Sequence, residues 1–139
     1  MVLAMDYAGC VARDMKPIWI VDDDESIRWV LEKALARENL ATRSFSNVRD
    51  AVAALDSATP QVLVSDIRMP GESGLELLQI IKARNPGLPV IVMTALSFRE
   101  AEDVVRAGAD GFLTKPFAPE EVVARVDHLF ALRMQKTEG

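Results

Sequence analysis

The chain has 139 residues, of which half are hydrophobic and 27% charged, and its formal net charge is -5 at pH 7. These values predict one globular domain with a full hydrophobic core, and an acidic chain without a basic stretch argues against direct binding to nucleic acid. Because no apolar run has the length of a membrane span and none resembles a signal peptide, we expect a cytoplasmic protein without membrane contact.

Residues 1–14 show neither clean periodicity nor helix caps. We expect them to be an N-terminal extension, either disordered or a remnant of cloning. Their Cys10 is the single cysteine of the chain, which excludes an internal disulfide. The folded domain is expected over residues 15–133, and residues 134–139 are expected to form a tail or the start of a linker.

Five short apolar runs alternate with five helical patterns along the folded part. The runs, expected as strands, are Pro17–Val21, Ala41–Phe45, Val62–Ser65, Val90–Met93 and Gly111–Leu113. The helical patterns begin near Ser26, Val48, Gly74, Phe98 and Pro119. Such alternation predicts an α/β fold of flavodoxin type, (βα)5, with a doubly wound sheet of five parallel strands in the order 2-1-3-4-5.

Capping residues support these boundaries. Ser46 is a suitable N-cap for the second helix. Gly108 can adopt the left-handed conformation that commonly ends a helix, here the fourth, and Pro119 fits the first turn of the fifth helix. Ala118, which precedes Pro119, is a poor cap. The two tryptophans, Trp19 in the first strand and Trp29 in the first helix, are expected to be packing residues and not ligand platforms, with Trp29 near the exposed edge of its helical face.

Acidic residues stand where two of the predicted strands end. Asp22, Asp23 and Asp24 follow the first strand, and Asp66 ends the third apolar run. Since the carboxyl ends of parallel strands meet at one edge of a sheet, these carboxylates should converge, repel one another and attract a divalent cation. We expect Mg²⁺, or alternatively Mn²⁺, held by Asp23 and Asp66, with Asp22 acting directly or through water. Asp24 is expected to stabilise the start of the first helix instead.

Asp66 is placed to act as a nucleophile that accepts a phosphoryl group as an acyl phosphate. Lys115, after the fifth strand, would supply positive charge to a phosphoryl oxygen, and the Thr94 hydroxyl would donate to another. The backbone carbonyl of Arg68 is a further candidate cation ligand, and Pro70-Gly71 is expected to form a turn. The Lys115-Pro116 bond is a candidate cis peptide that would aim the lysine at the site.

The segments "IVDDDESIR", "SDIRMPGESGLELL", "PVIVMTAL" and "GADGFLTKPF" occur in an order that resembles the response-regulator receiver domain of bacterial two-component signalling. The resemblance covers about residues 16–132, and "DDDESIRWVLEKAL" with "SDIRMPG" is most similar to receivers of the nitrogen regulatory protein C (NtrC) family. It implies that Asp66 is the phosphoacceptor, Asp22 and Asp23 the acidic pocket, and Lys115 the pocket lysine. Thr94 would be the switch hydroxyl and Phe112 the switch aromatic.

Two features depart from the family pattern. The interval from Thr94 to Lys115 is one residue shorter than usual, and the missing residue falls near the helix that begins at Phe98. Position 112 is Phe instead of the frequent Tyr, so a rotamer switch there would work by packing alone.

The resemblance also implies a function. A sensor histidine kinase would phosphorylate Asp66, and the new charge would shift the face formed by the fourth helix, fifth strand and fifth helix. That face would control an output domain or partner protein, in transcription regulation, and phosphorylation would also favour a homodimer. The protein would be a signalling switch and not an enzyme, with only self-catalysed phosphoryl transfer and autodephosphorylation.

Several alternatives remain beside this interpretation. The chain would equally suit a stand-alone phosphorelay receiver, and a small metal-dependent phosphatase or phosphotransferase is a second class, disfavoured by the short connections. A receiver-like module that is never phosphorylated is disfavoured because every pocket residue is present. A flavin site is disfavoured because the loop after the first strand is acidic, and His128 is expected to be a surface residue without a phosphohistidine role.

Overall fold

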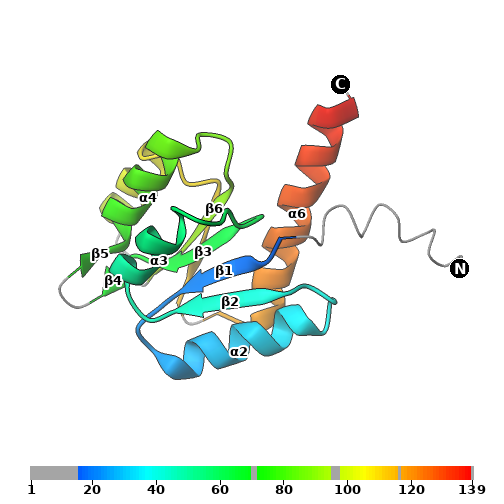
Figure 1. The fold of residues 1–139 in the computed structure, drawn as a ribbon, viewed down its shortest axis with the longest axis horizontal. Helices are drawn as coiled ribbons and strands as arrows, with labels where there is room; N and C mark the ends of the chain where they lie inside the picture. The colour runs from blue at the N-terminus through cyan, green and yellow to red at the C-terminus, as the bar shows by residue number, and fades with distance from the viewer. Residues whose placement is uncertain (1–15, 70–71, 95–97, 116, 139) are drawn as a thin grey trace, which may run out of the picture.

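The computed structural model describes residues 16–69, 72–94, 98–115 and 117–138, and its centre is a parallel sheet of five strands (Figure 1). The strands are β1 (Ile18–Val21), β2 (Thr42–Phe45), β3 (Leu63–Asp66), β6 (Val90–Thr94) and β7 (Gly111–Thr114). The helices are α2 (Glu25–Ala36), α3 (Val48–Ala54), α4 (Gly74–Arg84), α5 (Phe98–Arg106) and α6 (Pro119–Glu138). The spatial order β2-β1-β3-β6-β7 confirms the predicted doubly wound fold with strand order 2-1-3-4-5.

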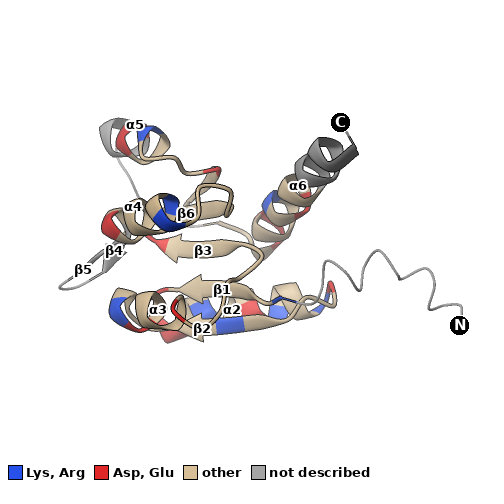
Figure 2. Cartoon of the chain, turned by 45° about the horizontal axis from the view of Figure 1, so that its top comes forward, with Lys and Arg blue, Asp and Glu red and all other residues tan. Residues whose placement is uncertain are grey.

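Helices cover both faces of the sheet, so the side chains of the central strands, which point alternately to the two faces, are buried on both. In β1, Trp19 and Val21 join the hydrophobic core that includes residues of α3, α4 and α5, whereas Ile18 and Ile20 join the core that includes residues of α2 and α6. All four side chains are 0% exposed, which explains why this strand reads as an uninterrupted apolar run. Figure 2 shows the central strands almost entirely tan, with the charged residues mainly on helices and loops.

A small antiparallel pair follows β3 and was not predicted. Strand β4 (Arg68–Met69) pairs with β5 (Glu72–Ser73), and the register places Arg68 opposite Ser73 and Met69 opposite Glu72. Residues 70–71, where we expected a turn, lie outside the described residues. Two-residue strands carry too little alternation to be read from sequence, which is why this pair was missed.

The helix caps agree with three predictions and correct one. Gly108 has a φ of 104°, and Pro119 begins α6 as expected. Ala118 offers no side-chain cap, and instead its N–H donates to Glu121 Oε2 at 2.8 Å while its carbonyl accepts from Glu121 N. The N-cap of α3 is Asn47 and not Ser46, because Asn47 Oδ1 accepts from the backbone of Asp50 at 2.7 Å.

The two tryptophans differ in burial. Trp19 is 0% exposed and packs against Phe45, with ring centroids 4.9 Å apart, as expected of a packing residue. Trp29 is 58% exposed, so it is not the packing residue that we expected, although its place near the exposed edge of the helical face agrees with the expectation. It lies outside the buried stripe of α2, with the Lys33 ammonium 5.5 Å from its ring centroid.

The C-terminal helix α6 continues to Glu138, so residues 134–138, expected to begin a linker, are helical. Their role as a linker stays a prediction. Within the described ranges, no helix combines the length and the apolar character needed to cross a membrane.

Candidate functional site

The predicted acids converge at the carboxyl edge of the sheet, because β1 and β3 are parallel neighbours. Asp22 follows the last residue of β1 and Asp66 is the last residue of β3. Each of Asp22, Asp23 and Asp66 offers a carboxylate oxygen, and the three oxygens lie within 4.8 Å of one another. Asp22 is 0% exposed and Asp66 is 6% exposed, whereas Asp23 is exposed. Two buried carboxylates and one exposed carboxylate therefore form a cluster that opens to solvent on the Asp23 side.

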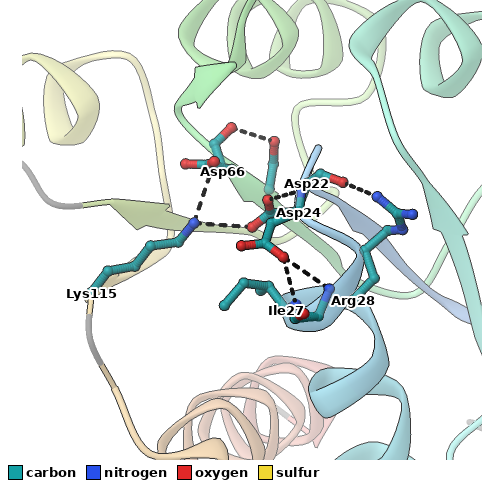
Figure 3. A network of polar contacts seen from close by, with 8 residues as sticks. Asp22, Asp24, Ile27, Arg28, Asp66 and Lys115 are labelled. Atoms are coloured by element: carbon teal, nitrogen blue, oxygen red, sulfur yellow. Dashed lines mark hydrogen bonds and ion pairs between the residues drawn. The ribbon is translucent and has the colours of Figure 1, made fainter. Parts of the chain in front are cut away.

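Lys115 reaches this cluster from beyond the edge strand β7. Its Nζ lies 3.1 Å from Asp22 Oδ2 and 3.3 Å from Asp66 Oδ2 (Figure 3). The lysine side chain is 24% exposed, so the two contacts are partly shielded from solvent. One ammonium thus bridges the ends of β1 and β3.

Burial and charge act in opposite directions on this pair. Burial raises the pKa of Asp22 above its ordinary value of 3.8, and this effect outweighs the Asp24 N–H and Lys115, which favour the ionised form. Burial alone would lower the pKa of Lys115, but the hydrogen bond and charge of Asp22, together with Asp66, prevail and raise it above 10.5. The complete burial of Asp22 explains why its pKa rises although it has a cationic partner. Lys115 stays charged at neutral pH and leaves the three-acid cluster with a shortage of positive charge.

Backbone contacts hold the loop that carries Asp22 and Asp23. Asp22 Oδ1 accepts from Asp24 N at 2.9 Å, and Asp24 Oδ1 caps α2 by accepting from Ser26 N at 2.8 Å. Arg28 Nη1 donates to the carbonyl oxygen of Asp22 at 2.6 Å. We did not predict this arginine contact. No residue-type pattern in the sequence indicates a contact between a helix side chain and a backbone carbonyl group.

The remaining predicted residues are placed as follows. Arg68 lies in β4, and the position of its carbonyl relative to the acids is not described. Thr94 ends β6 opposite Thr114 of β7, while its side chain and Pro116 lie outside the described residues, so the switch hydroxyl and the cis peptide stay predictions. Phe112 is partly buried against the core on the α3, α4 and α5 face.

The last helix carries the one histidine of the sequence. His128 is exposed on α6, as expected of a surface residue.

The acid cluster fits a small divalent cation. Octahedral Mg²⁺ binds oxygens at about 2.1 Å, which places its ligands roughly 3–4 Å from one another and leaves several positions for water. Three oxygens within 4.8 Å need only a small closure to reach that spacing. The oxygen-only donor set, free of histidine and cysteine, suits a hard cation such as Mg²⁺ or Mn²⁺ better than zinc.

Comparisons with known proteins agree with this geometry. The family described as response regulator receiver domain matches residues 18–127. The DNA-binding transcriptional regulator NtrC of Salmonella typhimurium is 54% identical over 111 residues, which cover 79% of this chain and 24% of that protein. The chain therefore spans about a quarter of the length of this curated relative.

Two solved structures share the fold. The solution structure of the apo receiver domain of nitrogen regulatory protein C is 52% identical with a TM-score of 0.74, covering 82% of this chain and 93% of that one. The BeF3-activated receiver domain of DrrB is 34% identical with a TM-score of 0.76, and the match covers 84% of this chain and 98% of that one. The family match and these relatives together show that the chain belongs to the response regulator receiver domain family and is of the NtrC type.

Proposed function

We propose that Asp66 accepts a phosphoryl group from a sensor histidine kinase, and that Asp22, Asp23 and Asp66 hold the Mg²⁺ that this transfer requires. The observation that carries the proposal is the contact of Lys115 Nζ with both Asp22 and Asp66, beside a third acid within 4.8 Å. A purely structural ion pair needs one acid for one lysine. Two acids that share one lysine, with a third acid beside them, concentrate negative charge beyond what the lysine neutralises, and this suits cation binding.

In the proposed reaction a carboxylate oxygen of Asp66 attacks the phosphorus of a phosphohistidine. The O–P bond forms as the N–P bond breaks, and the imidazole leaves with the bonding electron pair. Bound Mg²⁺ would neutralise the charge that develops on the phosphoryl oxygens. Lys115, already 3.3 Å from Asp66, would pair with one of these oxygens, and the Thr94 hydroxyl would donate to another.

The same lysine connects the acids to a second surface. A hollow of about 780 Å³ lies between α5, β7 and α6, and Lys115, Phe112 and Val105 are among its lining residues. When the phosphoryl group draws Lys115, and with it the end of β7, toward Asp66, Phe112 would repack into a different position on this face. We propose that this repacking changes how α5, β7 and α6 contact an output domain, a partner protein or a second copy of the chain.

The identity of the output is also part of the proposal. Because NtrC of Salmonella typhimurium is a DNA-binding transcriptional regulator and its receiver region matches this chain, we propose that the phosphorylated domain regulates transcription through further domains or a partner. A stand-alone phosphorelay receiver would use the same site. Assaying the phosphorylated chain for phosphate transfer to a histidine-containing domain separates these two roles.

Incubation with acetyl phosphate and Mg²⁺, followed by intact-mass spectrometry, tests the phosphorylation. We expect a single phosphoryl adduct that needs the metal, disappears in Asp66→Asn, and persists in the control Asp127→Asn, which removes an exposed acid on α6. A folded wild-type protein that gains no mass would contradict the proposal. Steady turnover of a generic phosphate ester would favour a phosphatase instead.

A further inference from the structure

We infer that Arg28 is a positioning residue that holds the acidic loop in the shape needed for Mg²⁺. Its guanidinium Nη1 donates to the carbonyl oxygen of Asp22 at 2.6 Å, and its backbone N–H donates to the carbonyl oxygen of Asp24 at 3.1 Å. The arginine side chain therefore holds the loop at Asp22, before Asp23, and the first backbone hydrogen bond of α2 holds it at Asp24, after Asp23. Its role depends on the Mg²⁺ binding proposed above.

Asp23 is the acid that most needs such support. In the described part of the chain, no hydrogen bond or ion pair holds its carboxylate, and the side chain is exposed. Asp22, in contrast, is buried and contacts both Asp24 and Lys115. The position of the Asp23 carboxylate is thus set by its backbone, and that backbone is held at Asp22 and Asp24.

The two cations near Asp22 have different partners. In Figure 3, Lys115 approaches the carboxylate of Asp22 from one side while Arg28 contacts its carbonyl group from the other. A cation near a metal site normally weakens binding of Mg²⁺ through repulsion. If Arg28 acted only through its charge, its removal would tighten Mg²⁺ binding, whereas loss of a positioning contact would weaken it.

The test is a Mg²⁺ titration of wild type, Arg28→Gln, Arg28→Lys and Lys33→Gln by isothermal calorimetry, with unfolding by urea measured in EDTA. We expect Arg28→Gln to raise the dissociation constant roughly tenfold, the effect typical of residues that orient metal ligands. Arg28→Lys, which keeps the charge and one terminal donor group, should recover part of the affinity. Lys33→Gln removes the same charge from the same helix without touching the loop, and should leave the constant unchanged.

Each outcome bears on the inference. If Arg28→Gln binds Mg²⁺ as tightly as wild type or more tightly, Arg28 does not position the loop, and a loss of stability alone would indicate a purely structural role. Should Arg28→Gln fail to fold in EDTA, the same comparison applies to Arg28→Lys, for which unchanged affinity is the overturning result. If the folded wild-type protein itself binds no Mg²⁺, the proposed metal site fails, and the role of Arg28 fails with it.

Discussion

Replacing Lys115 with methionine should destabilise the metal-free protein and, at the same time, strengthen its response to Mg²⁺. Methionine keeps the length and apolar stem of lysine and removes only the ammonium. The ammonium lies 3.1 Å from Asp22 and 3.3 Å from Asp66, and the Asp22 side chain is fully buried. The variant therefore leaves two carboxylates close together without their shared cation.

The size of the effect follows from these distances. At an effective dielectric constant of about 20, an ion pair at 3.1 Å represents about 5 kcal/mol of gross attraction, and most of it is offset by desolvation. Removing one partner of a buried pair costs about 3–5 kcal/mol. Because Lys115 is 24% exposed, solvent screens part of the interaction, and we expect a loss of about 2–3 kcal/mol in unfolding free energy.

The response to Mg²⁺ should change in the opposite direction. Lys115 and the cation neutralise the same carboxylates, so each weakens the interaction of the other. If the variant binds Mg²⁺ roughly tenfold more tightly, a saturating concentration stabilises it by about 1.4 kcal/mol more than it stabilises wild type. Mg²⁺ should then restore about half of the stability that the substitution removes.

Urea unfolding in EDTA and in saturating Mg²⁺, followed by circular dichroism, measures both effects. Lys82→Met is the matched control, because Lys82 is also partly buried and pairs with Asp110 at 2.8 Å, away from the acid cluster. The control should lose stability without any change in its response to Mg²⁺. A Lys115→Met protein that Mg²⁺ stabilises no more than it stabilises wild type would refute the competition between Lys115 and the cation.

Three further predictions concern the acids and a helix cap. Asp66→Asn should abolish the mass gain with acetyl phosphate and change the unfolding free energy by less than about 1 kcal/mol, because it removes attraction to Lys115 and repulsion from Asp22 together. Burial raises the pKa of Asp22, so the contribution of this acid to stability is complete below its ordinary 3.8 and is lost as pH rises through the raised value. As the pH rises from about 4 to about 7 in EDTA, the unfolding free energy of Asp22→Asn should therefore increase relative to that of wild type. The same difference in unfolding free energy at both pH values would contradict this. Asn47→Ala should lower the unfolding free energy by about 1 kcal/mol, whereas Ser46→Ala should change it by less than about 0.5 kcal/mol.

The central strands β1 and β3 were predictable because they are buried on both faces, whereas the edge strands β2 and β7 are partly exposed. Each of the five strands of the sheet begins and ends within a residue of its apolar run, and the helices begin at or next to the residues where their periodicity starts. The sequence identified the residue that caps a helix less clearly. Ser46 and Asn47 are both good N-caps by type, and only the reach of Asn47 to Asp50 N distinguishes them.

The site was predictable to the extent that strand ends determine it. Asp22, Asp66 and Lys115 follow or end strands, and the parallel topology brings such positions together whatever the intervening sequence. Arg28 was missed because its contact runs from a helix side chain to a backbone carbonyl, and no residue-type pattern marks a carbonyl group. Trp29 was expected to pack, although it stands near the exposed edge of its helical face, because a large aromatic residue beside an apolar stripe usually belongs to that stripe.

The complete burial of Asp22 makes its ionised form costly to the stability of the fold. A buried acid whose pKa is raised is less stable when ionised than it would be in water, and a neutral residue of the same shape would avoid that cost. Lys115 offsets only part of this cost, because the same ammonium also pairs with Asp66. The remaining negative charge is what would attract the proposed Mg²⁺ to the cluster. In the proposed reaction a phosphoryl group would add charge at the position that Lys115 already contacts, and a movement of this lysine would link the acids to the face beside β7.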